Sequence, residues 1–245
     1  MIDLNIAGVV PLSTIDWPDH LCATVFLQGC PWKCGYCQNQ ELLDPRIEGE
    51  VSWEEVSALL DRRRGLLDGV VFSGGEATRQ DGLGAAIADV RARGFQVGLH
   101  TAGAYPNKLA RVIGDVNWVG LDIKAMPEHY REVVGYDMGG KGWQCLDIVL
   151  AEAEQRENFS YEVRTTVHPD SMAGRFLPDI VAELRARGVQ TFALQEAREL
   201  GTSAEFRKQA HSWDLERWQD EWAQMVELVE NAGFSKVYIR AAQGA

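Results

Sequence analysis

The chain has no long hydrophobic run. None of its apolar stretches approaches the roughly 20 consecutive residues that a membrane-spanning helix needs. The N-terminus, Met1–Asn5, has neither the basic segment nor the long apolar segment of a secretory signal peptide. These absences predict a cytoplasmic protein without a membrane partner, in a compartment where thiols stay reduced and can hold iron.

Positive charge is also scarce. The 245 residues include 24 lysines and arginines against 36 aspartates and glutamates, which gives a formal net charge of −12. Such a surface repels phosphate backbones, so nonspecific binding of nucleic acid is not expected. The one basic cluster, Arg62–Arg64, ends a predicted helix, where positive charge is favourable.

The sequence contains no internal repeat and no low-complexity linker, so no domain boundary is visible in it. A length of 245 residues suits one large α/β domain better than two small ones. The apolar fraction of 46% is sufficient for a sizeable core. We therefore expect a single domain over residues 1–245.

Short apolar runs alternate with amphipathic segments along most of the chain. Strands are predicted at residues 22–27, 69–72, 95–100, 118–123, 161–167, 190–194 and 236–240. A helix is predicted to begin after Ser52, which forms a capping box with Glu55, and further helices at 82–93, 143–157 and 175–187. Late in the chain, core positions at helical spacing are Leu215, Trp218, Trp222, Met225 and Val229. The alternation predicts an α/β fold with a mostly parallel sheet, as a barrel or partial barrel.

Three of the five cysteines are crowded together at Cys30, Cys34 and Cys37. The spacing Cys-x3-Cys-x2-Cys brings three thiolates onto one tight loop. An iron–sulfur cube has four irons that each want a ligand, so three cysteines leave one iron open, as a catalytic metal site requires. Tyr36, directly before the last cysteine, can lay a flat face beside whatever binds that open iron.

Zinc and disulfides are the alternatives to an iron–sulfur cluster. Zinc wants four ligands, and the chain has no second Cys/His pair with metal-ligand spacing. Disulfides are disfavoured by the odd number of cysteines and by a chain long enough for a real core. Cys22, which opens an apolar run, and Cys145, in a predicted helix, are interpreted as buried structural thiols.

Charged and polar residues, together with a pair of glycines, follow the predicted strands. In parallel α/β folds the chemistry collects at the C-terminal ends of the strands. The residues at these ends are Ser73, Gly74, Gly75, Glu76, His100, Thr101, Ala102, Gly103, Asp122, Lys124, Arg164, Thr166, His168 and Gln195. The pattern therefore predicts that they share one edge of the sheet with the cysteine loop.

The cysteine motif, with an aromatic residue before its last cysteine and a Gly-Gly-Glu turn at residues 74–76, resembles the radical S-adenosylmethionine (SAM) superfamily. Within it, the chain resembles glycyl-radical-enzyme activases, most closely the anaerobic ribonucleoside-triphosphate reductase activating branch. The supporting stretches are residues 28–31, 36–39, 97–101, 119–125, 164–167 and 194–195. The similarity extends over nearly the whole chain.

This resemblance implies a partial (β/α)6 TIM-like barrel and a set of cofactor contacts. Cys30, Cys34 and Cys37 would hold a [4Fe–4S] cluster whose open iron takes the amino and carboxylate groups of SAM. The other implied cofactor-binding residues are Tyr36 and Gln38 beside adenine, Gly74 and Gly75 in close backbone approach, Glu76 on the methionyl ammonium, Lys124 on its carboxylate, Asp122 on the ribose or on a nearby cation, and Arg164, His168 and Gln195. For Arg164 and His168 a purely structural hydrogen bond at a strand end is an equal alternative. No side chain is expected to be catalytic beyond the cluster and SAM.

The function implied by the resemblance is reductive cleavage of SAM to a 5′-deoxyadenosyl radical that abstracts a hydrogen atom. The substrate would be a glycine of a glycyl radical enzyme, such as an anaerobic ribonucleotide reductase, with a flavodoxin or ferredoxin-type electron donor. A radical SAM enzyme that acts on a small molecule or peptide is one alternative, and a non-catalytic iron–sulfur or zinc module is another. The sequence departs from the commonest family patterns at Ala77–Thr78, His100 and Ala102, which bears on the target protein.

Overall fold

The computed structural model describes residues 2–242, and these residues form two compact units. The first unit comprises residues 2–31, 41–121 and 144–161, and the second comprises 32–40, 122–143 and 162–242. The chain therefore passes between the units several times. The single domain expected from the sequence stays a prediction.

The described residues form eight strands, whose order in the sheet follows the sequence. They are β1 (Ile6–Ser13), β2 (Cys22–Leu27), β3 (Gly69–Gly74), β4 (Gln96–Thr101), β5 (Trp118–Asp122), β6 (Ser160–Val167), β7 (Thr191–Glu196) and β8 (Lys236–Arg240). In the first unit β2, β3, β4 and β5 pair in parallel, and in the second unit β6, β7 and β8 do the same. The predicted α/β fold with a mainly parallel sheet is confirmed, and its strand order is that of a TIM-like barrel.

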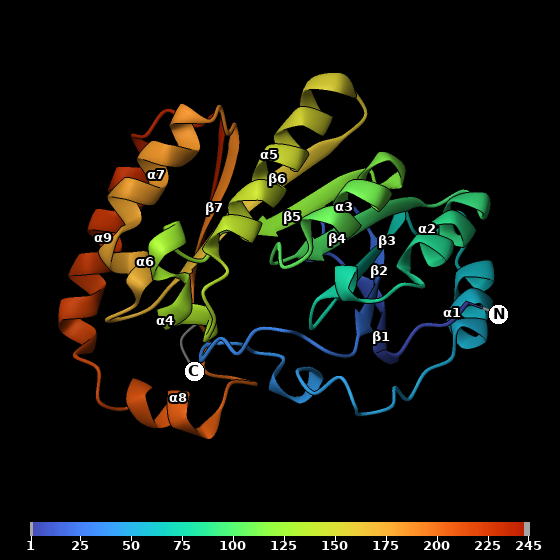
Figure 1. Ribbon diagram of the computed structural model, residues 1–245, viewed down its shortest axis with the longest axis horizontal. Coiled ribbons are helices and arrows are strands. Elements are labelled where there is room, and N and C mark those ends of the chain that lie inside the picture. Colours follow the sequence, from blue (N-terminus) through green and yellow to red (C-terminus); the bar gives the residue numbers. More distant parts are fainter. Residues whose placement is uncertain (1, 243–245) are drawn as a thin grey trace. The chain divides into compact units, whose positions relative to one another are not determined.

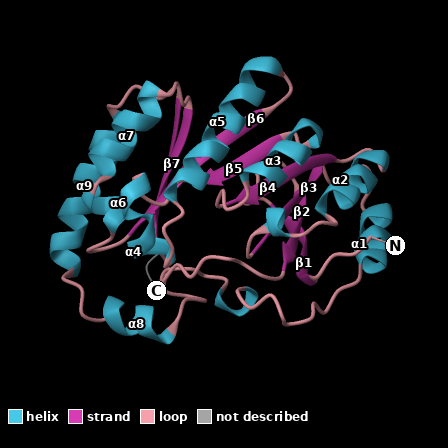
Figure 2. Cartoon of the chain, in the orientation of Figure 1, coloured by secondary structure: helices cyan, strands magenta, loops and turns pink. Residues whose placement is uncertain are grey.

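Helices follow most strands, as parallel pairing requires. They are α1 (Trp53–Arg62), α2 (Leu83–Ala92), α3 (Pro106–Val112), α4 (Tyr130–Val134), α5 (Gly139–Gln155), α6 (Met172–Arg175), α7 (Leu177–Ala186), α8 (Ala204–Ala210) and α9 (Leu215–Glu230). In the first unit α2 and α3 lie on the same side of β3 and β4 (Figure 1). In the second unit α7 and α9 lie side by side next to β7 (Figure 2).

Strand β1 was not predicted, and it is the one antiparallel partner among the pairings. It pairs with β2, with irregular register between Ile6 and Gly8 and again between Val10 and Ser13. Small residues and Pro11 interrupt its apolar pattern, which explains why periodicity alone does not reveal it. On its other side, among residues 2–242, it makes an isolated bridge to Val51.

Local sequence signals explain several element boundaries. Helix α1 begins with the predicted capping box, in which Ser52 and Glu55 each accept a hydrogen bond from the other's backbone N–H. On α9, Trp218 and Val229 are buried as predicted, but Leu215 at the first helical position is 60% exposed, so its assignment to the core was wrong. The helix begins there, before its apolar face meets the sheet.

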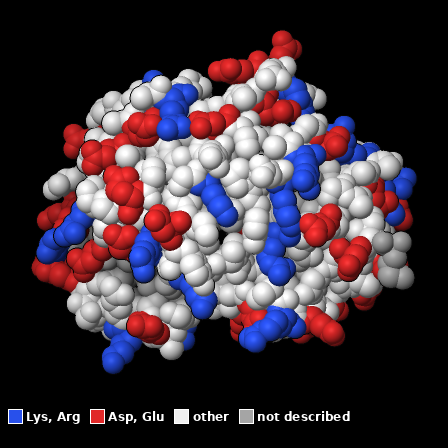
Figure 3. Space-filling model, in the orientation of Figure 1, with Lys and Arg blue, Asp and Glu red and all other residues white. Residues whose placement is uncertain are grey.

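The structure places the two remaining cysteines in the core, as predicted. Cys22 opens β2 and Cys145 lies on α5, and neither side chain is exposed. Burial raises the pKa of Cys22 to about 11, so this thiol stays protonated and inert. No helix within residues 2–242 is both long and apolar enough to cross a bilayer. Acidic and basic side chains are interspersed on the face drawn in Figure 3.

Candidate active site

The turn after β3 packs backbone against backbone on the loop that leads to the first motif cysteine. Gly75 N donates to Leu27 O at 2.9 Å, and Glu76 N donates to Gly29 O at 3.0 Å. A Cβ atom on Gly75 would lie 2.6 Å from Gly29 O, and one on Gly74 would lie 2.3 Å from Leu27 N. Real Cβ atoms do not come so close, so both predicted glycines are required by this backbone contact.

Glu76 is buried and held by four hydrogen bonds. Its Oε1 accepts from Thr78 N at 3.1 Å, Thr78 Oγ1 at 2.6 Å and Thr101 Oγ1 at 2.7 Å, and its Oε2 accepts from Ala102 N at 2.9 Å. The side chain is 1% exposed. Each carboxylate oxygen has about two acceptor sites. Oε1 is therefore saturated, whereas Oε2 keeps capacity for one further donor.

Thr78 and Ala102 thus both donate hydrogen bonds to Glu76. They are among the residues at which the sequence departs from the commonest patterns of the family it resembles. The sequence analysis placed Thr101 at a strand end without giving it a role, and it did not assign Thr78 to the site. A local signal existed for Thr78, because Glu76 caps the short turn Ala77–Arg79 and a hydroxyl two residues later can reach its carboxylate. Thr101 lies on the neighbouring strand, and its contact with Glu76 had no local signal.

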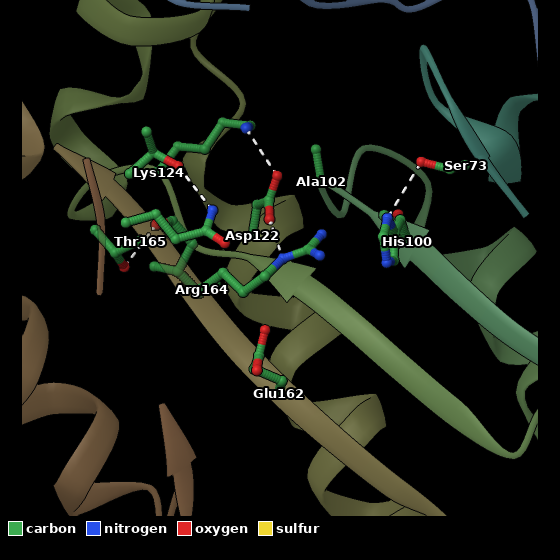
Figure 4. A network of polar contacts seen from close by, with 12 residues as sticks. Ser73, His100, Ala102, Asp122, Lys124, Glu162, Arg164 and Thr165 are labelled. Carbon is green, nitrogen blue, oxygen red and sulfur yellow. Dashed lines mark hydrogen bonds and ion pairs between the residues drawn. The ribbon is translucent and has the colours of Figure 1, made fainter. Parts of the chain in front are cut away.

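His100 makes structural contacts in the first unit. Its Nδ1 lies 3.2 Å from Ser73 Oγ, as Figure 4 shows, and its Nε2 lies 2.7 Å from Asp16 O. Its ring meets Trp118 edge to face, with 5.4 Å between the ring centroids. With both ring nitrogens engaged, His100 anchors the β1–β2 loop to the ends of β3 and β4.

In the second unit, Asp122 joins Lys124 and Arg164 in one charged cluster (Figure 4). Asp122 Oδ1 accepts from Arg164 Nε at 2.7 Å, and Oδ2 accepts from Lys124 Nζ at 3.2 Å. Strand β5 ends at Asp122 and β6 carries Arg164, and Ile123 N donates to Arg164 O at 2.9 Å. The strand pairing therefore brings together the three residues that the sequence analysis placed at separate strand ends.

Neighbouring charges determine the direction in which the pKa values of Asp122 and Lys124 are shifted. Burial by itself would raise the pKa of Asp122, but the facing Arg164 and Lys124 outweigh burial and hold the pKa well below its usual range. Burial would likewise lower the pKa of Lys124, and the neighbouring Tyr36 and Asp122 reverse this and raise it. The cluster therefore carries one carboxylate and two cations, for a net charge of about +1.

The last two motif cysteines lie on a tight turn of the second unit. Cys37 N donates to Cys34 O at 3.1 Å, and Gln40 Nε2 donates to the carbonyl oxygens of both cysteines, at 3.3 Å and 3.1 Å. Burial raises the pKa of both thiols, and nearby Lys124 opposes this. Gln40, which sequence reasoning missed, thus fixes the turn between two motif cysteines.

The other predicted residues of the second unit differ in their exposure and in their contacts. Tyr36 is close to both Lys124, whose Nζ lies 5.4 Å from the ring centroid, and His168, at 5.8 Å between ring centroids. Gln38 is exposed. Gln195 is engaged elsewhere, since its Nε2 donates to Thr166 Oγ1 at 3.2 Å and its Oε1 accepts from Arg240 at 2.9 Å.

Comparison with known proteins decides the family. The profile of the radical SAM superfamily matches residues 24–144. A Methanocaldococcus jannaschii protein named "Putative glycyl-radical enzyme activating enzyme" is 30% identical over 183 residues, which cover 74% of this chain and 75% of the relative. The chain belongs to the radical SAM superfamily.

Two further comparisons concern a second relative and a solved structure with a similar fold. A pyruvate formate-lyase-activating enzyme of Clostridium pasteurianum is 28% identical over 160 residues, which cover 63% of this chain and 65% of that enzyme. The crystal structure of Streptococcus suis SuiB bound to S-adenosylmethionine is similar with a TM-score of 0.62 at 11% identity and covers 89% of this chain. The chain spans about half of SuiB, 49% of its length. This likeness shows the fold.

Membership of the radical SAM superfamily implies a [4Fe–4S] cluster and SAM. The donor set fits, because all five cysteines are free thiols and three of them have the spacing that leaves one iron open. No group of three or more His, Cys, Asp or Glu side chains is arranged to hold a metal ion within residues 2–242. The assignment of the cluster to Cys30, Cys34 and Cys37 therefore rests on the motif and the family.

The contact at Gly75 predicts that Gly75→Ala disturbs the cysteine loop. The new Cβ would displace Gly29 and cost about 1–3 kcal/mol of unfolding free energy, and we expect less iron per chain after anaerobic reconstitution. The matched control is Gly84→Ala, whose Cβ meets only Val112 Cγ1 at 3.7 Å. Iron is measured colorimetrically, and an unchanged iron content in Gly75→Ala would contradict the prediction.

The charged cluster predicts a pH-dependent loss of stability in Asp122→Asn. The variant removes the carboxylate that faces Lys124 and Arg164, so at pH 7 its free energy of unfolding should fall by about 3–5 kcal/mol. Because the pKa of Asp122 is lowered by folding, its contribution is present above the unfolded pKa of about 4 and is lost as the pH falls through the folded value. The difference from wild type should therefore narrow below about pH 4.

Urea unfolding at pH 7 and at acidic pH measures this difference. Asp220→Asn, at an exposed position of α9, is the control and should change the free energy of unfolding by less than about 0.5 kcal/mol. A difference between wild type and Asp122→Asn that stays constant down to low pH would argue against a lowered pKa.

Proposed function

We propose that this radical SAM protein is a glycyl-radical-enzyme activating enzyme and that its partner is an anaerobic ribonucleotide reductase or a related glycyl radical enzyme. The observation that carries the proposal is the 30% identity to a relative with an activating-enzyme name, over about three quarters of both chains. The similarity to a pyruvate formate-lyase-activating enzyme supports it. The motifs quoted from the sequence favour the ribonucleotide reductase branch.

In this proposal Cys30, Cys34 and Cys37 hold the cluster. When bound, the cluster and SAM supply an electron and a carbon-centred radical that removes a hydrogen atom. Glu76 accepts a hydrogen bond from the methionyl ammonium group through Oε2, the oxygen with remaining capacity. Gly74 and Gly75 hold the backbone before Glu76 in place.

The charged cluster of the second unit binds the rest of the cofactor. Lys124, which is 8% exposed, pairs with the methionyl carboxylate, and the net positive charge of the cluster favours this anion. Asp122 accepts from the ribose, and Arg164 holds Asp122 in place. Tyr36 and Gln38 lie beside the adenine, and His168 and Gln195 are the remaining proposed contacts.

In this proposal the enzyme is a single domain, and the glycine of the partner enters its active site. No side chain of the enzyme takes part directly in removing the hydrogen atom. A flavodoxin or ferredoxin-type protein delivers the electron, and a cytoplasmic, anaerobic setting keeps the thiols reduced. The glycine loop of the partner closes the site and excludes water, which a radical requires.

The cluster assignment predicts a sharp division among the five cysteines. Replacing any one of Cys30, Cys34 or Cys37 with alanine should abolish the cluster, whereas Cys22→Ala and Cys145→Ala should keep about four irons per chain. Iron analysis and the visible spectrum after anaerobic reconstitution measure this. Stoichiometric zinc without iron in the wild-type protein would refute the assignment.

The proposed activity is tested by electron paramagnetic resonance. The reduced protein, SAM and a candidate ribonucleotide reductase are mixed anaerobically, and we expect a glycyl radical doublet on the partner together with 5′-deoxyadenosine. Cys34→Ala is the control for the cluster, and a partner with its glycine replaced by alanine is the control for the radical site. Neither control should give the doublet.

Cofactor cleavage without a radical on any glycyl radical enzyme of the host would contradict the proposal. That outcome would instead favour a small-molecule or peptide substrate for the same site. An absence of both cofactor cleavage and iron would favour a non-catalytic module.

A further inference from the structure

The first unit carries a basic patch on α3 and on the turn before α2, defined here as Arg79, Lys108 and Arg111. Residues 77–80 and 101–112 contain these three cations and no acidic residue, although the whole chain has a net charge of −12. Figure 3 shows basic side chains gathered where Figure 1 draws α3. The local charge of the patch is therefore opposite in sign to that of the protein.

One carboxylate is paired with the patch, and it leaves most of the positive charge uncancelled. Lys108 Nζ donates to Asp81 Oδ1 at 2.8 Å and also to Arg79 O. Asp81 is 94% exposed, and Lys108, with Arg111 and Arg79 further away, lowers its pKa. Within residues 2–242 the guanidinium groups of Arg79 and Arg111 make no ion pair. The four side chains together carry a net charge of about +2.

The patch reaches the loop that carries the first motif cysteine. Gly29 has φ +96, and a Cβ there would lie 3.2 Å from Arg79 Nη1 and 2.9 Å from Pro45 Cβ. Gly29 directly precedes Cys30, whose side chain is half-buried. The residues on either side of Pro45 form an ion pair with each other, so this segment adds no net charge. The guanidinium group of Arg79 therefore lies against the cysteine loop.

Tyr105 is close both to the patch and to the same cysteine. Lys108 Nζ lies 5.4 Å from the centroid of its ring. Burial raises the pKa of Tyr105, the charge of Arg79 opposes this, and the charges of Glu76 and Cys30 add to it. The surface of α3 is thus continuous with the surroundings of Cys30.

The proposed cleavage of SAM consumes one electron, which a separate molecule has to deliver to the cluster. Electron-transfer partners meet through small interfaces, and complementary charge raises the rate of their encounter. We propose that a small acidic electron-transfer protein docks on the basic patch and passes its electron to the cluster on the side of Cys30. The flavin or iron–sulfur group of the donor is oxidised by one electron and the cluster is reduced by one, without a change in any bond. This inference rests on the proposed function and adds the place and the charge of the docking surface.

The other basic cluster of the first unit lies at the opposite edge of the sheet. Arg62–Arg64 precede β3 and so belong to the N-terminal ends of the strands. Cys30 follows the C-terminal end of β2, which runs parallel to β3. Arg62 is exposed, so its replacement changes the charge of the protein without touching the proposed surface.

The test measures how fast a reduced, acidic flavodoxin reduces the iron-loaded protein, by anaerobic stopped-flow absorbance. The rate constant of wild type should fall as potassium chloride is added, because salt screens the attraction between the two proteins. In the double variant Lys108→Glu, Arg111→Glu we expect a rate constant at low salt about tenfold below that of wild type. At about 0.5 M salt the two should agree within about twofold.

Single variants separate the patch from net charge and from folding. Arg111→Glu breaks no contact within residues 2–242 and should still slow the reduction by about threefold or more at low salt. Arg62→Glu makes the same charge change at the opposite edge of the sheet and should stay within about twofold of wild type. Arg79 is kept, because its replacement would also change the contact with Gly29.

A neutral reductant shows that the cluster itself is unchanged in each variant. Photoreduced 5-deazariboflavin does not need the docking surface, so it should reduce the wild type and all variants at equal rates. Iron content, cleavage of SAM after this photoreduction and the glycyl radical doublet on the partner should also equal those of wild type.

A rate of reduction by flavodoxin that is independent of salt, or equal in wild type and the double variant, would overturn the inference and leave the proposed function standing. Loss of the glycyl radical doublet in the photoreduced double variant would overturn it too, because the patch would then bind the glycyl radical enzyme. If photoreduced, iron-loaded wild type cleaves no SAM, the proposed function itself is wrong.

Discussion

The site of this radical SAM protein depends on a contact between two backbones, at the turn after β3 and the loop that follows β2. Gly75 and Gly29 approach so closely that neither the turn nor the loop can move alone. Glu76 follows this contact directly and donates its own N–H across it. The first motif cysteine and the buried carboxylate therefore directly follow two segments that this backbone contact holds together.

The two buried carboxylates of the strand ends are stabilised in different ways. Glu76 accepts from hydroxyl and amide groups, which are neutral, and it makes no ion pair among the described residues, so its negative charge is not cancelled. Asp122 lies between Lys124 and Arg164, which leaves an excess of positive charge. An α-amino acid group carries one charge of each sign. Glu76 therefore suits a cationic group, and the cluster around Asp122 suits an anionic group.

Much of the fold could be predicted because buried parallel strands are short apolar runs. All seven predicted strands are present, whereas β1 escaped because Gly8 and Pro11 interrupt its pattern. The motif identified the family, since the spacing of its cysteines is local in sequence. The contact of Thr101 with Glu76 could not be predicted, because only the fold brings the two side chains together. Periodicity contains no information about such pairs.

The irregular first strand has a consequence for behaviour at high protein concentration. A strand that ends a sheet presents free backbone groups to other molecules, and apolar side chains there invite aggregation. Val10 is 39% exposed and Leu12 is 50% exposed, yet Pro11 between them has no N–H to donate. The breaks in register near both ends of β1 further bend this border. The features that hid the strand from pattern analysis are thus the ones that discourage a second copy from adding to the sheet.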